Sequence, residues 1–132
     1  MKNYQLLNGS NLAYIGDAYY ELKVREYLIN KGITKSKELR KVSIDFVSAS
    51  AHQKIYEEIK DEFTEEENKI FLRGRNSASF GHRKNVDRAS YAISTGLEAV
   101  IGYLYLSNNE KRLDYLIHLI FVLNFRFLFL NE

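Results

Sequence analysis

The chain has 132 residues, of which 45% are hydrophobic and 14% aromatic, and its formal net charge is +2. This length supports one hydrophobic core and is too short for two ordinary domains, so we expect a single domain over residues 1–132. Cysteine is absent, which excludes disulfides and thiolate metal sites and leaves oxygen or imidazole ligands. A net charge this close to neutral does not identify a partner.

Neither end of the sequence predicts a membrane segment. Residues 1–12 lack an apolar run of signal-peptide length, so we expect an unprocessed, cytoplasmic protein. Residues 115–130 are apolar but interrupted by His118, Asn124 and Arg126, whereas a spanning helix needs roughly 20 apolar residues. We expect a helix that contacts both its own subunit and a dimer partner. Its phenylalanines are Phe121, Phe125, Phe127 and Phe129.

The expected elements are all helical, because apolar residues recur every three to four positions, proline is absent and glycine is sparse. A first long helix begins after Ser10 or Asn11 and ends at Gly32. A short helix over 36–41 and a longer one over about 43–60 follow. Thr64 and Glu67 form a capping box, which starts a helix that ends near residue 75.

The second half of the chain predicts a loop and two further helices. Residues 76–85, NSASFGHRKN, are small, polar and basic, which is typical of a surface loop. A fifth helix is expected over about 87–106 and a sixth over about 110–128, after a turn at residues 107–109. No internal repeat or linker interrupts this order, in agreement with one domain.

Two carboxylates are the most informative side chains. Asp17 lies in AYIGDAYYEL (residues 13–22) and Glu98 in STGLEAVIGYL (residues 94–104), each on an otherwise apolar helical face. A carboxylate withdrawn from water costs several kcal/mol unless it is neutralised, paired with a cation or bound to a metal. Two such groups, far apart in sequence, suggest one shared metal site.

Three glycines support a meeting of these two segments. Gly16, Gly96 and Gly102 lie inside the predicted helices, where each costs about 1 kcal/mol relative to alanine. Close approach of two helix backbones is the simplest compensation. It would also bring Asp17 and Glu98 together.

Two oxygen ligands without cysteine or a closely spaced histidine pair favour Mg²⁺ or Mn²⁺ over zinc. The chemistry then implied is metal-assisted hydrolysis of a phosphodiester. A second interpretation remains open, in which Asp17 pairs with a nearby Arg or Lys and Glu98 accepts hydrogen bonds from hydroxyl groups.

Glu21 is either an outer ligand or a partner of Arg25. His52 and His118 lie on predicted helices and are weak candidates for catalysis.

Cationic side chains gather in two stretches, over residues 23–41 and 73–88, while acidic side chains gather over 61–67. Clustered cations can follow a phosphate backbone. They are equally compatible with ordinary solvated helix faces.

The segment AYIGDAYYELKVREYL (13–28) closely resembles the signature helix of the ribonuclease III catalytic domain, and LEAVIGYLYL (97–106) resembles that family's second catalytic helix. KVSIDFVSASAHQ (41–53), RGRN (73–76) and KNVDRASYAISTGLEA (84–99) resemble mini-ribonuclease III, the short bacterial branch that lacks a double-stranded-RNA-binding domain. The similarity spans nearly the whole chain in the expected order.

The resemblance implies an all-α homodimer that cuts both strands of an RNA duplex with Mg²⁺, and the characteristic task of this branch is maturation of the large-subunit (23S) ribosomal RNA precursor. It implies that Asp17 and Glu98 are catalytic and bind the metal. Larger members carry further acids where this chain has Ser10, Ala13 and Thr95. Without a separate RNA-binding domain, we expect RNA contacts from residues near the 76–85 loop: Arg73, Arg75, Asn76, His82, Arg83, Lys84 and Asn85.

Two alternatives to an enzyme follow from the same residues. A catalytically inactive dimer could hold structured RNA or a ribosomal protein on the same basic surface, and the missing family acids motivate that hypothesis. A purely structural helical protein would show no salt-dependent RNA binding.

Overall fold

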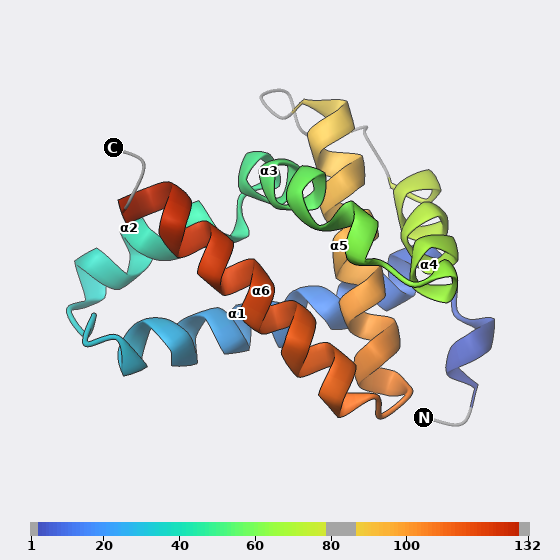
Figure 1. Cartoon of the computed structure of the whole chain (residues 1–132), viewed down its shortest axis with the longest axis horizontal. Coiled ribbons are helices and arrows are strands. Elements are labelled where there is room, and N and C mark those ends of the chain that lie inside the picture. The colour runs from blue at the N-terminus through green and yellow to red at the C-terminus, as the bar shows by residue number, and fades with distance from the viewer. Residues whose placement is uncertain (1–2, 79–86, 130–132) are drawn as a thin grey trace.

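A computed structural model describes residues 3–78 and 87–129. In this part of the chain the backbone forms six α-helices, two 3₁₀ turns and no strand, which confirms the expected all-α class (Figure 1). The helices are α1 (Gly9–Asn30), α2 (Ser36–Val47), α3 (Ala49–Ile59), α4 (Glu65–Asn76), α5 (Arg88–Leu106) and α6 (Glu110–Phe129). Within these residues, no helix combines the length and apolar character needed to cross a membrane.

The limits of α1 differ slightly from the prediction. Its cap is Asn8, whose side chain accepts a hydrogen bond of 2.8 Å from the backbone N–H of Asn11, so the helix begins before Ser10. The expected end near Gly32 is confirmed, because the last helical residue is Asn30 and Gly32 adopts a φ of 90°. That left-handed conformation favours glycine, which has no Cβ.

The break between α2 and α3 was predicted near residue 42 and lies at Ser48 instead. Ser48 has an extended backbone, with a ψ of 153°, and its hydroxyl accepts a hydrogen bond of 3.2 Å from the Ala51 N–H. Serine satisfies an otherwise unpaired N–H at a helix start, which makes it a preferred cap. Ser43, the start that the sequence favoured, lies inside α2.

The later helices follow the prediction closely. Thr64 and Glu67 form the expected capping box at the start of α4, and Asp87 caps α5 through a hydrogen bond to the Ala89 N–H. Asn108 adopts a φ of 58° in the turn between α5 and α6. The expected surface loop falls partly outside the described residues, because α4 extends to Asn76 and the description stops at residue 78.

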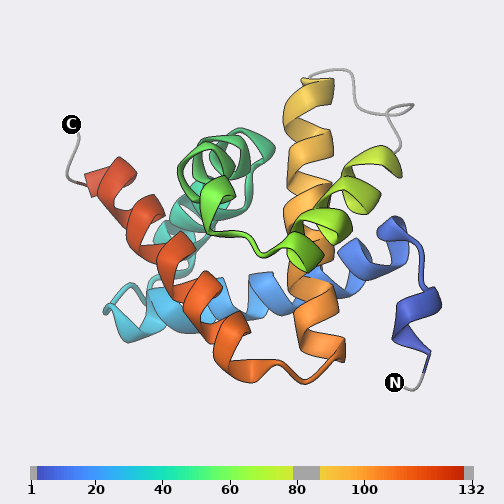
Figure 2. The same cartoon turned by 45° about the vertical axis from the view of Figure 1, so that its right-hand side comes forward.

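Helix α5 is the centre of the molecule and contacts α1, α3, α4 and α6. Figure 2 shows α5 crossing α1, with α4 on one side of it and α6 on the other. Most of its residues are buried over the whole circumference, as expected for a helix surrounded by others. Helix α1 is therefore held against the core by its contact with α5.

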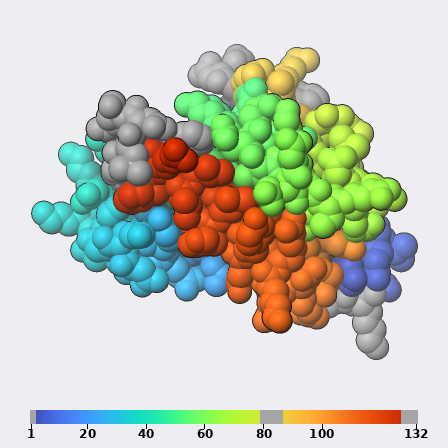
Figure 3. All heavy atoms as spheres, in the orientation of Figure 1, coloured from blue at the N-terminus to red at the C-terminus, as the bar shows by residue number. Residues whose placement is uncertain are grey.

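Helix α6 has one buried face and one exposed face. Phe121 is buried beside Tyr27, with ring centroids 4.7 Å apart, whereas Tyr115 and Val122 are exposed. The space-filling view shows α6 running across one face of the molecule beside α3 (Figure 3). Phe125 is half-buried. The side chains of Phe127 and Phe129 lie outside the described residues.

Candidate metal centre

Two glycines let α1 and α5 meet backbone to backbone. A Cβ on Gly16 would overlap the carbonyl oxygen of Glu98, and a Cβ on Gly102 would overlap that of Leu12. The expected role of Gly16 and Gly102 is therefore confirmed. Gly96 has a different reason, because a Cβ there would lie 2.6 Å from the ring of Phe71 on α4.

This crossing places both carboxylates on one open cleft. Asp17, from α1, and Glu98, from α5, line a cleft of about 420 Å³. Glu21, one turn after Asp17, lines it as well. The remaining walls are mostly hydroxyl-bearing or small residues: Ser10, Ala13, Tyr14, Val47, Ala49, Ser77, Ala78, Tyr91, Ser94 and Thr95. The two residues that the sequence singled out thus share one solvent-filled site.

The exposure of the two carboxylates corrects the argument from burial. Asp17 is exposed and Glu98 is half-buried, so neither is withdrawn from water as an apolar face would require. Ala13 and Tyr20 are buried beside Asp17, but Asp17 itself lies at the edge of that face. A periodic pattern identifies a face without locating its boundary with solvent.

The donor set of the cleft fits a hard cation. Among the described residues, its walls contain carboxylates and hydroxyls but no Lys, Arg or His, and no salt bridge involves Asp17. Mg²⁺ prefers oxygen ligands, keeps several waters and takes only one or two protein carboxylates. No group of three or more His, Asp or Glu side chains that could hold a metal occurs in the described part of the chain. A cation bound in this cleft would be held by Asp17 and Glu98, with water completing its shell.

The three positions at which the resemblance predicts further acids in larger family members are part of this cleft. Ser10, Ala13 and Thr95 all line it. The hydroxyl of Ser10 donates to the Ser77 carbonyl at 3.3 Å, and that of Thr95 donates to the Tyr91 carbonyl at 3.0 Å. Neutral side chains therefore occupy these places, and the acidic side chains among the lining residues are Asp17, Glu21 and Glu98.

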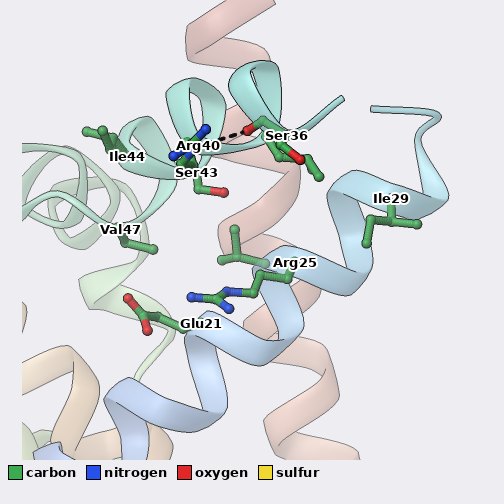
Figure 4. Close-up of a pocket in the computed structure, with 10 residues that line it drawn as sticks. Glu21, Arg25, Ile29, Ser36, Arg40, Ser43, Ile44 and Val47 are labelled. Carbon is green, nitrogen blue, oxygen red and sulfur yellow. Dashed lines mark hydrogen bonds between the residues drawn. The ribbon is translucent and has the colours of Figure 1, made fainter. Parts of the chain in front are cut away.

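A second groove, of about 810 Å³, adjoins the cleft between α1 and α2 and shares Glu21 and Val47 with it. In Figure 4, Glu21 and Arg25 extend from α1 into the space beside α2. No ion pair joins Glu21 to Arg25 in the part of the chain that the structure describes. The pairing with Arg25, one of the two possibilities that the sequence left open for Glu21, is therefore not formed, and Glu21 faces both hollows.

A buried polar network that the sequence did not reveal lies directly behind the cleft. The Nδ1 atom of His52, on α3, is 2.6 Å from the hydroxyl oxygen of Ser94. Tyr20 donates to the Phe46 carbonyl oxygen at 2.7 Å and accepts from Asn124 at 3.3 Å. The only sequence signal for this network is that Ser94 precedes Glu98 by one helical turn.

The histidine of this network is neutral at physiological pH. Burial lowers the pKa of His52 to about 4, although the negative charge of Asp17 and a backbone hydrogen bond to Phe46 act in the opposite direction. Burial likewise raises the pKa of Tyr20, so its hydroxyl remains a donor. His118, by contrast, is exposed on α6.

Three of the expected RNA-binding residues lie at the end of α4, beside the cleft. Arg73, Arg75 and Asn76 are exposed, and the following residues, Ser77 and Ala78, form part of the cleft wall. The guanidinium of Arg73 also donates to the Leu7 carbonyl at 3.4 Å. The other four, His82, Arg83, Lys84 and Asn85, lie outside the described residues.

Comparison with known proteins places these features in a family. The Ribonuclease III domain matches residues 10–109. A protein named Mini-ribonuclease 3 from Enterococcus faecalis is 40% identical over 120 residues, which cover 89% of this chain and 91% of that protein. A Mini-ribonuclease 3 from Clostridium tetani is 44% identical over 86% of this chain and 76% of its own length.

The fold agrees with a solved structure as well. A crystal structure of a Fusobacterium nucleatum protein matches with a TM-score of 0.78 and 30% sequence identity, over 91% of this chain and 93% of that one. The family match covers both segments that form the cleft, because residues 10–109 include Asp17 and Glu98.

Proposed function

Because the chain belongs to the ribonuclease III family and is an endoribonuclease of that type, we propose that it hydrolyses double-stranded RNA with Mg²⁺, or with Mn²⁺ as a substitute, held by Asp17 and Glu98. The observation that carries this proposal is the cleft itself. Two carboxylates, from α1 and α5, line one cleft together with several hydroxyl-bearing side chains, and such oxygen ligands suit a hard cation.

The chain's own residues supply geometry for this reaction. Gly16 allows α1 to approach the Glu98 carbonyl, so the spacing between the two carboxylates is set by backbone contact. A divalent cation held there would lower the pKa of a water molecule and neutralise phosphate oxygens, so that attack leaves a 5′-phosphate and a 3′-hydroxyl. Among the described residues, no Lys, Arg or His lines the cleft that Asp17 and Glu98 share.

RNA binding would come from the surface beside the cleft. Arg73 and Arg75 would contact phosphates from the end of α4, next to Asn76, and the proposal extends this surface to His82, Arg83, Lys84 and Asn85. Duplex RNA is recognised mainly through its shape, 2′-hydroxyls and phosphates. We therefore expect affinity that depends on salt and weak dependence on base sequence.

We propose further that the chain acts as a cytoplasmic homodimer on the 23S ribosomal RNA precursor, together with a ribosomal protein. Its similarity to proteins named Mini-ribonuclease 3 motivates this extension. A two-fold symmetric pair of clefts fits the two antiparallel strands of a duplex, because a closed dimer repeats each site once. The catalytic domain alone would then make all contacts with the RNA.

The test is cleavage of a perfect RNA duplex labelled on both strands, with Mg²⁺ and with chelator. Asp17→Asn and Glu98→Gln should each reduce cleavage more than about 100-fold, since even changes to the partners of metal ligands cost about 10–100-fold. Asp114→Asn, which neutralises an exposed carboxylate of α6, should cleave like the unmodified protein.

Several results would contradict the proposal. Cleavage that persists in chelator would exclude the cation, and full activity of Asp17→Asn or Glu98→Gln would exclude the assigned ligands. Cuts confined to one strand would argue against paired sites. Salt-dependent binding of the duplex without any cleavage would instead support the inactive RNA-binding alternative.

A further inference from the structure

Two neighbouring hydroxyls on α5 behave differently. Thr95 donates to the carbonyl of Tyr91, four residues earlier in the same helix, at 3.0 Å, which is the usual arrangement for Ser and Thr inside helices. Ser94 instead bonds to His52 on α3, at 2.6 Å. Ser94 is 6% exposed and lines the same cleft as Asp17 and Glu98. A contact between helices therefore determines where the Ser94 hydroxyl points.

The direction of that hydrogen bond depends on which nitrogen of the His52 ring carries the proton. Neutral imidazole has one N–H donor and one acceptor nitrogen. In the tautomer that carries its proton on Nε2, Nδ1 is the acceptor and the Ser94 hydroxyl is the donor.

We propose that His52 is a positioning residue, which holds the proton of the Ser94 hydroxyl toward α3. The lone pairs of the Ser94 oxygen then face the cleft. There they accept a hydrogen bond from the hydration shell of a cation at Glu98. This inference rests on the proposed metal site. Ser94 lies one turn before Glu98, so both side chains project from the same face of α5.

An uncharged hydrogen-bond acceptor at Ser94 would help to orient the water molecules around the cation. Water that hydrates a divalent cation is a strong hydrogen-bond donor, and oriented outer partners hold the shell in place. The positions that carry acids in larger relatives are neutral here, and the hydroxyls of Ser10 and Thr95 donate within the protein. Ser94 supplies an acceptor without adding negative charge beside the two carboxylates.

The test measures Mn²⁺ affinity of the RNA-free protein by electron paramagnetic resonance of the unbound ion. Ser94→Ala should weaken Mn²⁺ binding by about 10-fold or more and lower kcat for duplex cleavage, with KM for RNA unchanged within about twofold. A merely structural hydroxyl would affect thermal stability but leave the Mn²⁺ affinity unaltered.

Ser90→Ala is the matched control. Ser90 is also buried on α5 and also bonds to α3, through the side chain of Gln53, but it is not part of the cleft wall. Its removal should leave Mn²⁺ affinity within about twofold of the unmodified protein. An equal loss in the Ser90 and Ser94 variants would overturn the proposal, because it would show that any link between α3 and α5 has the same effect.

A second measurement examines the ring directly. ¹⁵N NMR shifts of His52 should show the tautomer protonated at Nε2 at neutral pH, and a ring protonated at Nδ1 would overturn the proposal. If Glu98→Gln weakens Mn²⁺ binding and Ser94→Ala does not, this inference fails while the proposed function stands. If the unmodified protein neither binds Mn²⁺ nor cuts duplex RNA, the proposed function itself fails.

Discussion

Gly16 sets the position of one proposed metal ligand, Asp17, because it has no side chain. A Cβ at this position would overlap the Glu98 carbonyl oxygen and approach the backbone nitrogen of Gly102 to 2.8 Å. Both obstacles are backbone atoms, which cannot rotate away as a flexible side chain could. The stability of the α1 and α5 contact and the geometry of the cleft thus depend on the same residue.

Gly16→Ala should therefore lower both stability and metal affinity. Overpacking a close contact costs about 1–3 kcal/mol, which should appear as a lower free energy of unfolding in urea, together with weaker Mn²⁺ binding. Glu26→Ala, at an exposed position of the same helix, is the control and should leave metal binding unaltered. If Gly16→Ala is as stable as the unmodified protein and binds Mn²⁺ as tightly, then α1 and α5 are not in close contact.

The sequence predicted the two carboxylates of this site but not their exposure or the hydrogen bond behind them. Asp17 and Glu98 could be paired from sequence, since acids next to glycines inside apolar helices are unusual. Their exposure could not, because the edge of a buried face depends on how far the neighbouring helix reaches. The bond between His52 and Ser94 joins residues 42 positions apart, and neither has a distinctive local pattern.

At the scale of elements, a buried ion pair joins α4 to α6. Arg112 donates to both carboxylate oxygens of Glu67, at 2.8 and 2.9 Å, and Glu67 also accepts from the Thr64 N–H at 2.9 Å. Burial of Glu67 opposes its ionisation, but the hydrogen bonds from Arg112 and Thr64 outweigh it and lower the pKa of Glu67. The carboxylate that caps α4 is thus also the anchor of α6.

The lowered pKa predicts a definite pH dependence of stability. A carboxyl group whose pKa is lower in the folded state stabilises the fold above its unfolded pKa, about 4.3 for Glu, and this contribution is lost as pH falls through the folded value. The free energy of unfolding should fall below about pH 4.3, and less steeply in Glu67→Gln. An equal acid dependence in both proteins would contradict the assignment.

Arg112→Met tests the same pair from the other side. It leaves a buried carboxylate without its charged partner and should cost about 1.5–3 kcal/mol, the value of hydrogen bonds to a charged group. Glu57→Gln is the control, because the pair of Glu57 with Lys60 is exposed and surface pairs contribute little.

Helix boundaries show which local signals are sufficient. Thr64 and Glu67 predicted the start of α4 because their two hydrogen bonds are reciprocal and lie within four residues. The start of α3 was missed because Ser43 and Ser48 are both acceptable caps, and the structure uses Ser48. Capping residues thus indicate where a helix can begin, and the packing of the helix determines which of two equivalent serines is used.

At the scale of the molecule, α5 holds the site together. It carries Glu98 and Ser94, contacts α1 at Gly16, and packs against α3, which carries His52. The all-α class could be predicted from periodicity, and the family from motifs along the chain. The central position of α5 was not predicted, although its residues are apolar on every side, which is typical of a helix surrounded by others.

The central claim is that Asp17 and Glu98 together hold one divalent cation, and a crystal of the protein soaked in Mn²⁺ tests it most directly. The account predicts an anomalous difference peak in the cleft between these two side chains, coordinated by their oxygens or bridged to them by water. A Mn²⁺ peak elsewhere, with the cleft between Asp17 and Glu98 empty at saturating Mn²⁺, would contradict it.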